Sequence, residues 1–300
     1  MPIIVKGLNY VYNAGTPFEK RALVDVNLKV ETGEFLCIIG HTGSGKSTFI
    51  QHLNGLIRVQ SGSIIVDDID LSEKKPDLKT LRTKVGMVFQ YPEYQLFADT
   101  VYKDVAFGPM NLKLSVKETD DRVMEALSLV GLNPELFKDK SPFELSGGEK
   151  RRAAIAGVIA MRPSVLVLDE PTAGLDPRGK REILNLIIKL KKESCPTIIM
   201  INHDMNEVAE YATNVAVFCD GTIKKCDCPQ KLFNEQEFLA NAGLELPKMA
   251  IIKHMLIEKG FNVNDDCLTV DKMFDEIIRL KKEKDAMTGQ SRLKREGKNV

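Results

Sequence analysis

Apolar residues occur along this chain either in short continuous runs or at regular intervals. The intervals change repeatedly between the alternation typical of strands and the three- to four-residue spacing typical of helices. Residues 3–12 and 22–30 alternate β-branched or apolar residues with polar ones, which predicts strands. The run 35–39 is too short for a helix and too apolar for an exposed strand, so it predicts a buried strand that ends at glycine. After Lys46, apolar residues recur at helical spacing. A strand, a glycine-rich turn and a helix are therefore expected in succession.

Strands and helices continue to alternate through the middle of the chain. Residues 116–130 predict a helix that Gly131 stops, and a further helix is predicted from near Ser146 to about residue 160. Buried strands are predicted at 165–168, 197–201 and 215–218, and a turn at Asp220-Gly221. This alternation predicts an α/β fold with a mostly parallel sheet covered on both faces.

The pattern changes after about residue 228, where runs of β-branched residues cease. Apolar residues at 270, 273, 274, 277 and 278 follow one stripe along a helix. We therefore expect two domains, residues 1–228 and a small helical domain of residues 229–300. The stripe packs either on its own domain or on a partner, and the sequence leaves both open. It also leaves open whether the basic end of the chain is solvated or contacts anionic lipid.

Composition narrows the class of protein. The 300 residues include 42 Lys and Arg and 42 Asp and Glu, a net charge of zero, whereas a dedicated nucleic-acid binder needs excess positive charge. The longest apolar runs are far shorter than the roughly 18 residues of a membrane-spanning helix. No charged-then-apolar leader opens the chain, and the six cysteines form no CxxC pair. We expect a cytosolic protein with reduced thiols and no nucleic-acid partner.

The first candidate site is a glycine-rich loop between the predicted strand at 35–39 and the helix that follows. Phosphate oxygens require several backbone N–H donors aimed at one point, and glycine lets the backbone curl that closely. Lys46 would supply a full positive charge to the β- and γ-phosphates, and Ser47 a hydroxyl to Mg²⁺. The loop consists of Gly40, His41, Thr42, Gly43, Ser44, Gly45, Lys46, Ser47 and Thr48.

The second candidate is an acidic pair at the end of the strand at 165–168. A buried strand presents the residues at its carboxyl end where open α/β sheets bind ligands. Asp169 is placed to hold Mg²⁺ through water, and Glu170 to orient or deprotonate an attacking water. For the dipeptide alone, a solvated pair of loop carboxylates is the alternative.

The third candidate is the start of the helix near residue 146. Ser146 and Glu149 have the spacing of a capping box, so a plain helix cap is the alternative to any function. Gly147 and Gly148 lie inside that cap, although each glycine costs a helix about 1 kcal/mol relative to alanine. Their bare N–H groups would suit a second phosphate-binding surface.

These motifs, in this order, resemble the ATP-binding cassette (ABC) ATPases over residues 3–228. Residues 145–149 look like that family's signature motif, with Glu149 where glutamine is commonest. The resemblance implies a phosphate-loop NTPase with a mostly parallel sheet, an N-terminal antiparallel β part, a helical subdomain at about 91–160 and a helical C-terminal extension. It implies ATP and Mg²⁺ as ligands.

Further roles are implied by position in the family pattern. Tyr12 corresponds to the aromatic that stacks on adenine, with a core aromatic as the alternative. Gln90 resembles the glutamine that touches Mg²⁺ and water, and would share the metal with Ser47 and Asp169. His203 resembles the switch histidine that contacts the γ-phosphate, and Asp176 lies in the loop that couples two nucleotide sites. The side chains of His41, His52 and His254 receive no role.

The resemblance also implies partners. In this family two cassettes close head to tail on two ATP molecules, with Ser146, Gly147, Gly148 and Glu149 of one facing the phosphate loop of the other. Residues 89–109 resemble the ATP-binding subunits of energy-coupling factor (ECF) transporters, which import vitamins and transition-metal ions. Residues 12–19 and 152–157 look like the second of the two paralogous ATPases in those complexes.

An ECF complex implies a peripheral protein on the cytoplasmic face of the cell membrane. Its partners would be a sister ATPase or a second copy, a transmembrane coupling subunit that docks near residues 90–110, and a substrate-binding membrane subunit. The five aromatics near the docking segment, together with Leu96, suit such a contact, although we expect about half of this set to fill the core of the helical subdomain: Tyr91, Tyr94, Leu96, Phe97, Tyr102 and Phe107. A cassette of another transporter type and a soluble ABC ATPase of translation or DNA repair are the alternatives.

Overall fold

The computed structural model describes residues 2–296, with side chains described as far as residue 284. The chain divides into two compact units. The first comprises the residues up to His203 together with Ala216–Cys226. The second comprises Asp204–Val215 and the chain from Asp227 onward.

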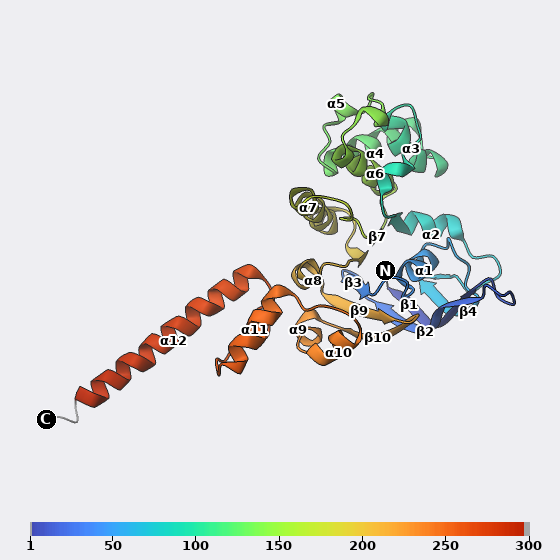
Figure 1. The fold of residues 1–300 in the computed structure, drawn as a ribbon. Coiled ribbons are helices and arrows are strands. Elements are labelled where there is room, and N and C mark those ends of the chain that lie inside the picture. The colour runs from blue at the N-terminus through green and yellow to red at the C-terminus, as the bar shows by residue number, and fades with distance from the viewer. Residues whose placement is uncertain (1, 297–300) are drawn as a thin grey trace. The chain divides into compact units, whose positions relative to one another are not determined.

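A six-stranded sheet carries the site-forming loops (Figure 1). Its strand order is β10-β9-β3-β8-β7-β6, and the pairs β3–β8, β8–β7 and β7–β6 are parallel. Every residue of β3, β6, β7 and β8 is buried, as the apolar runs predict, so the mostly parallel sheet is confirmed. The strands are β3 (Phe35–Gly40), β6 (Val85–Val88), β7 (Val165–Asp169), β8 (Thr197–Ile201), β9 (Asn214–Cys219) and β10 (Thr222–Asp227).

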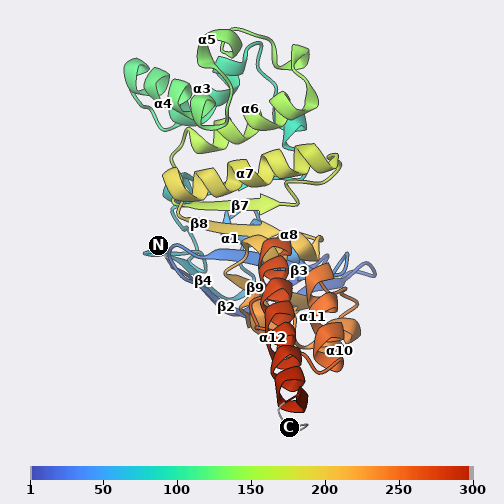
Figure 2. The same ribbon diagram turned by 90° about the vertical axis from the view of Figure 1, so that its left-hand side faces the viewer.

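Two connections of this sheet matter for the site. β7 leads into α7 (Pro177–Glu193), which lies along the sheet and returns the chain to the parallel neighbour β8 (Figure 2). β9 and β10 are joined by Asp220 and Gly221, both with positive φ, which is the geometry of a tight hairpin turn. The sequence pattern predicted the turn at Asp220-Gly221 but named no helix at residues 177–193.

A second sheet of four strands is antiparallel in its β1–β2, β1–β4 and β4–β5 pairs. One apolar core joins this sheet to the parallel sheet and to α1 (Lys46–Leu53), through side chains such as Val26, Phe49 and Phe218. The N-terminal antiparallel part is therefore confirmed. Its strands are β1 (Ile3–Tyr12), β2 (Lys20–Val30), β4 (Ser61–Val66) and β5 (Ile69–Asp70).

Between β6 and β7 the chain forms a group of helices (Figure 1). Gly131, at φ +77°, ends α4 as the sequence predicts, and Ser146 begins α6. The elements are α3 (Val101–Asn111), α4 (Val116–Leu129), α5 (Pro134–Phe137), α6 (Gly147–Ile159) and the short 3-10 helices η1 (Pro92–Gln95) and η2 (Pro142–Glu144). The helix α2 (Leu78–Lys84) precedes β6.

The expectation that half of the aromatic set near residues 91–107 fills a core is wrong. Tyr91, Tyr94, Phe97 and Phe107 are exposed, and Leu96 and Tyr102 are half-buried. Small aliphatic side chains occupy the interior of the helical group instead: Val101, Val105, Ala106, Val123, Leu127 and Ile155. The aromatic rings therefore remain on the surface of the first unit.

The second unit is helical from residue 229 as far as the structure describes it. Its small core contains Val263, Cys267, Met273 and Leu280. Of the predicted stripe on α12, Met273 is buried in this core, whereas Val270, Phe274, Ile277 and Ile278 are exposed. The helices are α8 (Met205–Tyr211), α9 (Pro229–Leu232), α10 (Gln236–Asn241), α11 (Lys248–Glu258) and α12 (Val270–Glu296).

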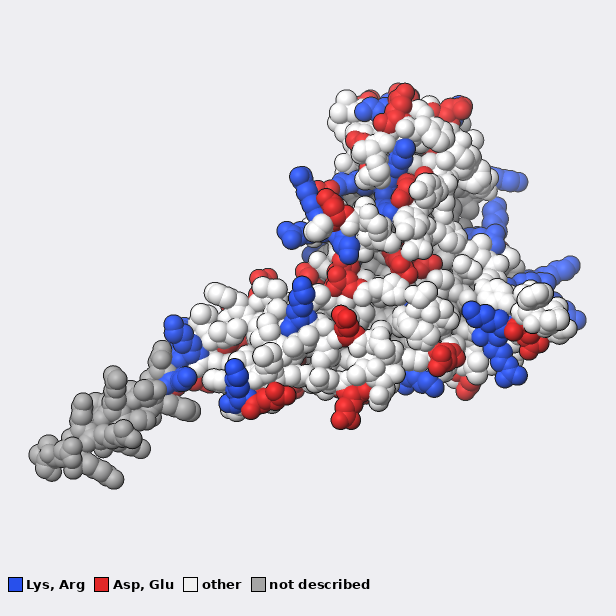
Figure 3. Space-filling view, in the orientation of Figure 1, with Lys and Arg blue, Asp and Glu red and all other residues white. Residues whose placement is uncertain are grey.

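Charged side chains of both signs are interspersed over the face seen in Figure 3. Lys281, Lys282 and Lys284 of the basic end are exposed. The side chains of Arg292, Lys294, Arg295 and Lys298 lie outside the described residues. Among the helices that the structure describes, none has the length and apolar character needed to cross a bilayer.

Candidate functional site

The glycine-rich loop between β3 and α1 lies directly against neighbouring backbone. A Cβ on Gly40 would lie 2.2 Å from the carbonyl oxygen of Phe218, and one on Gly45 would lie 2.5 Å from that of Ala22. Gly45 also has φ +104°, which side-chain-bearing residues rarely adopt. Both positions therefore require glycine for the loop to keep this curvature.

The loop directs hydrogen-bond donors toward one place. Gly45 is the N-cap of α1, and within the described residues no side chain caps this helix. The N–H groups of the first helical turn have no intrahelical partner, so they form an anion-binding end. The Lys46 ammonium lies across the loop, donating to the carbonyl oxygens of Gly40 at 2.7 Å and His41 at 2.9 Å. Burial lowers the pKa of Lys46, while Glu170 and Asp169 act to raise it.

Asp169 ends β7 beside the start of α1. Its Oδ1 lies 3.4 Å from the Ser47 hydroxyl, which donates to it. Burial raises the pKa of Asp169, and the hydrogen bond from Ser47 opposes that shift. A hydroxyl and a carboxylate oxygen at this separation are hard oxygen donors of the kind that Mg²⁺ accepts.

Glu170 follows at φ +47°, a strained conformation for a residue with a side chain. Gln90, which comes two residues after β6, donates from Nε2 to one carboxylate oxygen at 3.0 Å. His203, which follows β8, donates from Nε2 to the other at 2.8 Å, because a carboxylate can only accept. The ends of three adjacent parallel strands thus place Gln90 and His203 against the carboxylate of Glu170.

A pocket of about 230 Å³ joins the phosphate loop to this carboxylate. Tyr12 is half-buried on its wall, with its hydroxyl 3.2 Å from that of Thr48 and its ring edge-on to Tyr10. Lys20 and Ala22 also line the pocket. They reach it because β2 pairs with β1, and no sequence motif marks either residue. The remaining lining residues are Thr42, Gly43, Gly45, Lys46, Ser47, Thr48, Glu170 and His203.

The start of α6 is a separate site. The Ser146 backbone N–H and hydroxyl both donate to Glu149 Oε2, at 2.8 and 2.7 Å, and the Glu149 N–H returns a bond to Ser146 Oγ. These hydrogen bonds lower the pKa of Glu149. A Cβ on Gly147 or Gly148 would meet no atom within 4 Å, so the glycines are open to solvent.

A pocket of about 290 Å³ lies at this helix start. Ser146, Gly148 and Glu149 line it with Gly131, Leu132, Phe137, Arg152 and Glu182. Of the residues described, none lines both this pocket and the phosphate-loop pocket. One chain therefore does not bring the two predicted nucleotide-facing motifs together.

Two further predicted residues have local contacts. The Asp176 carboxylate caps α7 by accepting from the Gly179 N–H at 2.8 Å. The His41 side chain is exposed, with Nδ1 3.0 Å from the Thr42 carbonyl and Nε2 3.6 Å from an Asp220 carboxylate oxygen. Neither side chain lines the phosphate-loop pocket as the structure describes it.

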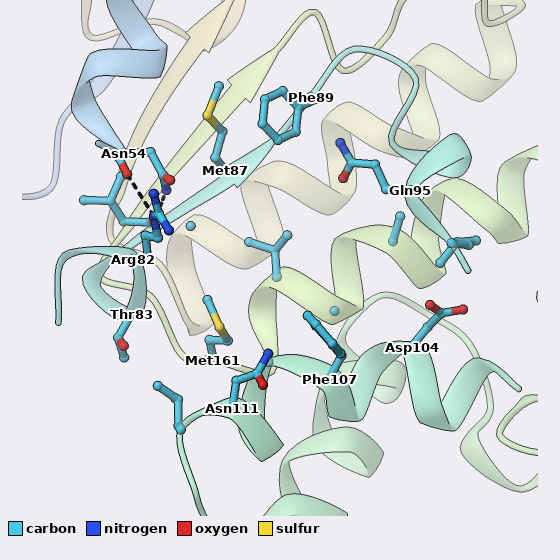
Figure 4. Close-up of a pocket in the computed structure, with 18 of the residues that line it drawn as sticks. Asn54, Arg82, Thr83, Met87, Phe89, Gln95, Asp104, Phe107, Asn111 and Met161 are labelled. Atoms are coloured by element: carbon cyan, nitrogen blue, oxygen red, sulfur yellow. Dashed lines mark hydrogen bonds between the residues drawn. The ribbon is translucent and has the colours of Figure 1, made fainter. Parts of the chain in front are cut away.

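A third hollow, of about 610 Å³, opens beside the predicted docking segment (Figure 4). Met87 and Phe89 enter it from β6 and the residue after it, and Phe107 from α3 (Figure 4). Asp104 is buried in its wall and accepts from the N–H groups of Phe97 and Ala98 with Oδ1. Within the described residues its other oxygen has no hydrogen-bond partner.

Comparison with known proteins places this geometry in a family. The family model described as "ABC transporter" matches residues 23–173. The "Energy-coupling factor transporter ATP-binding protein EcfA2" of Clostridium tetani is 51% identical over 93% of this chain and 97% of that protein. The protein of the same name from Clostridium acetobutylicum is 52% identical over 93% of this chain and 98% of its own length.

Two solved structures have the same fold. One is cbiO1 from Clostridium perfringens, described as part of the ABC transporter complex cbiONQ. Its TM-score is 0.69 at 42% identity, over 84% of this chain and 98% of that one. The other is the ATP-binding cassette MJ0796 in a dimeric post-hydrolysis state bound to ADP and Pi. Its TM-score is 0.66 at 31% identity, over 76% of this chain and 98% of that one.

Proposed function

The chain belongs to the ABC transporter family, and from that membership we propose that it is the ATP-binding and ATP-hydrolysing subunit of an ECF-type importer. One observation carries the proposal: identity of 51% over 97% of the length of a protein named as the ATP-binding protein of such a transporter. The imported substrates of this class are vitamins or transition-metal ions.

In this proposal the phosphate loop holds the triphosphate. The free N–H groups at the start of α1 donate to phosphate oxygens, and Lys46 turns its ammonium from the loop carbonyls to the β- and γ-phosphates. Tyr12 packs against the adenine, which its position on the pocket wall permits. Ser47, Asp169 and Gln90 offer the oxygen atoms for Mg²⁺, which would neutralise phosphate charge.

Glu170 is the proposed general base. Its carboxylate takes a proton from the attacking water, and that water must lie within hydrogen-bond reach of it. His203 and Gln90 fix the carboxylate by donating to its two oxygens, so each also sets where the water is held. The strained φ of Glu170 is consistent with a functional constraint on this side chain.

We propose that the complete nucleotide site forms between two cassettes. The separation of the two pockets within one chain supports this, because Ser146 and Gly148 then face the phosphate loop of a second cassette. That cassette is a sister ATPase in the leading form of the proposal and a second copy of this chain in the other. Residues 229–300 would contribute to pairing through the exposed apolar residues of α12.

The hollow beside residues 90–110 is the proposed seat of the transmembrane coupling subunit. Apolar grooves of this kind accept an amphipathic helix. The unsatisfied oxygen of buried Asp104 favours a docking helix that carries a basic side chain. A substrate-binding membrane subunit would complete the complex and place this chain on the cytoplasmic face of the membrane.

The test is affinity purification of the tagged chain from detergent-solubilised membranes, with its companions identified by mass spectrometry. A multi-span membrane protein together with a sister ATPase is the expected result. The same purification with Phe107→Glu, which puts a charge into the groove, should recover less of the membrane protein. Recovery of the chain with ribosomes or DNA, in a salt-sensitive manner, would instead indicate a soluble ABC ATPase.

A further inference from the structure

Arg151 is a buried arginine of α6 that the roles above do not use. It is 2% exposed, although it lies only two residues after Glu149. Its guanidinium makes a two-point contact with Glu93, from Nε at 3.1 Å and from Nη2 at 2.9 Å. Its Nη1 donates to the carbonyl oxygens of Pro171 at 3.0 Å and Ala173 at 3.1 Å.

The partners of Arg151 belong to two functional segments. Glu93 lies in η1, within the proposed docking segment and next to exposed Tyr94. Pro171 and Ala173 belong to the stretch that begins directly after Glu170. The guanidinium therefore connects a side chain of the docking segment to the backbone of the loop that follows Glu170.

A second contact joins the same two segments. Tyr91, at φ +59°, lies over Gly174, where an added Cβ would be 3.4 Å from a carbon of its ring. Gly174 has φ +74° and immediately follows Ala173. The docking segment thus contacts residues 171–174 through a charged link and through an aromatic one.

The chemistry of the charged link makes it stiff. A buried guanidinium must keep its partners, because leaving it unpaired in the interior is costly. Its planar fork matches a carboxylate at two points, which fixes direction as well as distance. A displacement of Glu93 must therefore either move Arg151, and with it the carbonyls of Pro171 and Ala173, or break the two hydrogen bonds between Glu93 and Arg151.

We propose that Arg151 is the positioning residue through which the docking segment, by way of Glu93, fixes the loop that follows Glu170 and so sets the rate of ATP hydrolysis. The proposal rests on the proposed function, since it requires a partner on the docking segment. It gives Arg151 no contact with ATP. Its effect should fall on turnover and not on nucleotide affinity.

The experiment is a double-mutant cycle in the purified membrane complex. Glu93→Gln, Arg151→Gln and the double variant are compared with the wild type for kcat, KM for ATP and recovery of the membrane partner. The double variant removes both charges together, so neither is left buried and alone. Arg151→Lys keeps the charge but cannot hold both segments, and it provides a second test should a glutamine variant fold poorly.

The matched control is an exposed ion pair between Arg162, which lies three residues beyond the last residue of α6, and Glu125 of α4. Arg162 and Glu125 lie 2.6 Å apart with side chains that are 56% and 52% exposed. Arg162→Gln with Glu125→Gln should leave kcat and KM unchanged, because exposed pairs of this kind contribute little.

The expected result is a loss of kcat of about threefold to thirtyfold in each single variant, the range of measured coupling through such contacts. KM and partner recovery should stay within about twofold of wild type. The double variant should lose no more than the worse single variant, because both act through one link.

Two results would overturn the inference. One is kcat equal to that of the Arg162 control, and the other is a loss that appears in KM or in partner recovery instead of kcat. Failure of the proposed function would look different, since the wild-type chain itself would then be recovered without a membrane protein.

Discussion

The first unit contains two helix starts that are rich in glycine, and they are built in opposite ways. At α1 the glycines are required by space, because a Cβ on Gly40 or Gly45 would strike the backbone of another segment. At α6 a Cβ on Gly147 or Gly148 would meet nothing. The first helix start has no side-chain cap in the described chain, whereas Ser146 and Glu149 cap the second with a complete capping box.

The difference indicates what each helix start is for. The start of α1 has no side-chain cap and is enclosed by other segments of the same chain. Its backbone N–H groups are therefore left to bind a ligand within this chain. A capped helix start needs no ligand for its stability, so glycines left open there serve close approach by something from outside. The same residue type therefore supports binding within the chain at α1 and contact across an interface at α6.

The largest effect should come from Glu170→Gln. This variant tests whether ATP is hydrolysed in the pocket that joins the start of α1 to Glu170. The amide keeps the shape and can still accept from His203, but it cannot take a proton from water. Hydrolysis should fall by about two to four orders of magnitude with ATP binding retained. The measurement is ATP turnover beside equilibrium ATP binding.

Glu193→Gln is the control for that variant, since this carboxylate is exposed at the end of α7. Its turnover should equal that of the wild type. Turnover retained in Glu170→Gln would remove Glu170 from the role of general base and leave the α1 site as a binding site alone.

Lys46→Ala should have the next largest effect. A charged hydrogen-bond donor to phosphate contributes enough that ATP affinity should fall by about ten- to a hundredfold. Titration with a fluorescent ATP analogue measures the change, and Lys29→Ala, at an exposed ion pair of β2, is the control. Equal ATP affinity in the two variants would mean that the loop at α1 does not bind phosphate through its lysine.

Sequence pattern predicted both helix starts because the information there is local. The loop glycines, the capping spacing of Ser146 and Glu149, and the acidic end of β7 are three separate signals, and each spans only a few residues. Arg151 carried no such signal, since its partners Glu93 and Pro171 are 58 and 20 residues away. Lys20 likewise reached the pocket only through strand pairing.

The aromatic set shows a different reason for failure. Apolar character alone suggested burial for about half of this set, but burial also requires an interior large enough to hold the ring. The two rings pack edge-on to each other at the surface, 5.1 Å apart, while aliphatic side chains fill the helical group. Side-chain volume in the interior depends on how α3, α4 and α6 pack, which the sequence pattern does not specify.

Paired glycine substitutions test the comparison directly. Gly45→Ala should destabilise the fold by about 1–3 kcal/mol or more, because the residue has φ +104° and its Cβ would lie 2.5 Å from the Ala22 carbonyl oxygen. Gly148→Ala should stabilise it by up to about 1 kcal/mol, since alanine suits a helix better. Thermal unfolding of the two variants should therefore shift in opposite directions.

Gly148→Ala should also lower hydrolysis in the assembled complex while leaving ATP binding to the isolated chain unchanged. The added methyl group would occupy the open face that approaches the second cassette. Destabilisation by Gly148→Ala, or stabilisation by Gly45→Ala, would mean that the two helix starts do not differ as described.

The smallest effect should come from Glu149→Gln. The amide oxygen can still accept from the Ser146 N–H and hydroxyl, so the cap survives, and one negative charge leaves the surface that faces the second cassette. Turnover should stay the same or rise. Stability should fall by about 0.3–1 kcal/mol at neutral pH, because a carboxylate near a helix start is favourable.

That stability difference should depend on pH. Hydrogen bonds from Ser146 lower the pKa of Glu149 in the folded chain, so its contribution is present above the ordinary value of 4.5 and disappears as pH falls through the lowered pKa. The unfolding curves of wild type and variant should therefore separate at neutral pH and converge in acid. A large loss of turnover in Glu149→Gln would instead mean that the charge at position 149 acts on the nucleotide, and that the start of α6 is more than a capped surface for close approach.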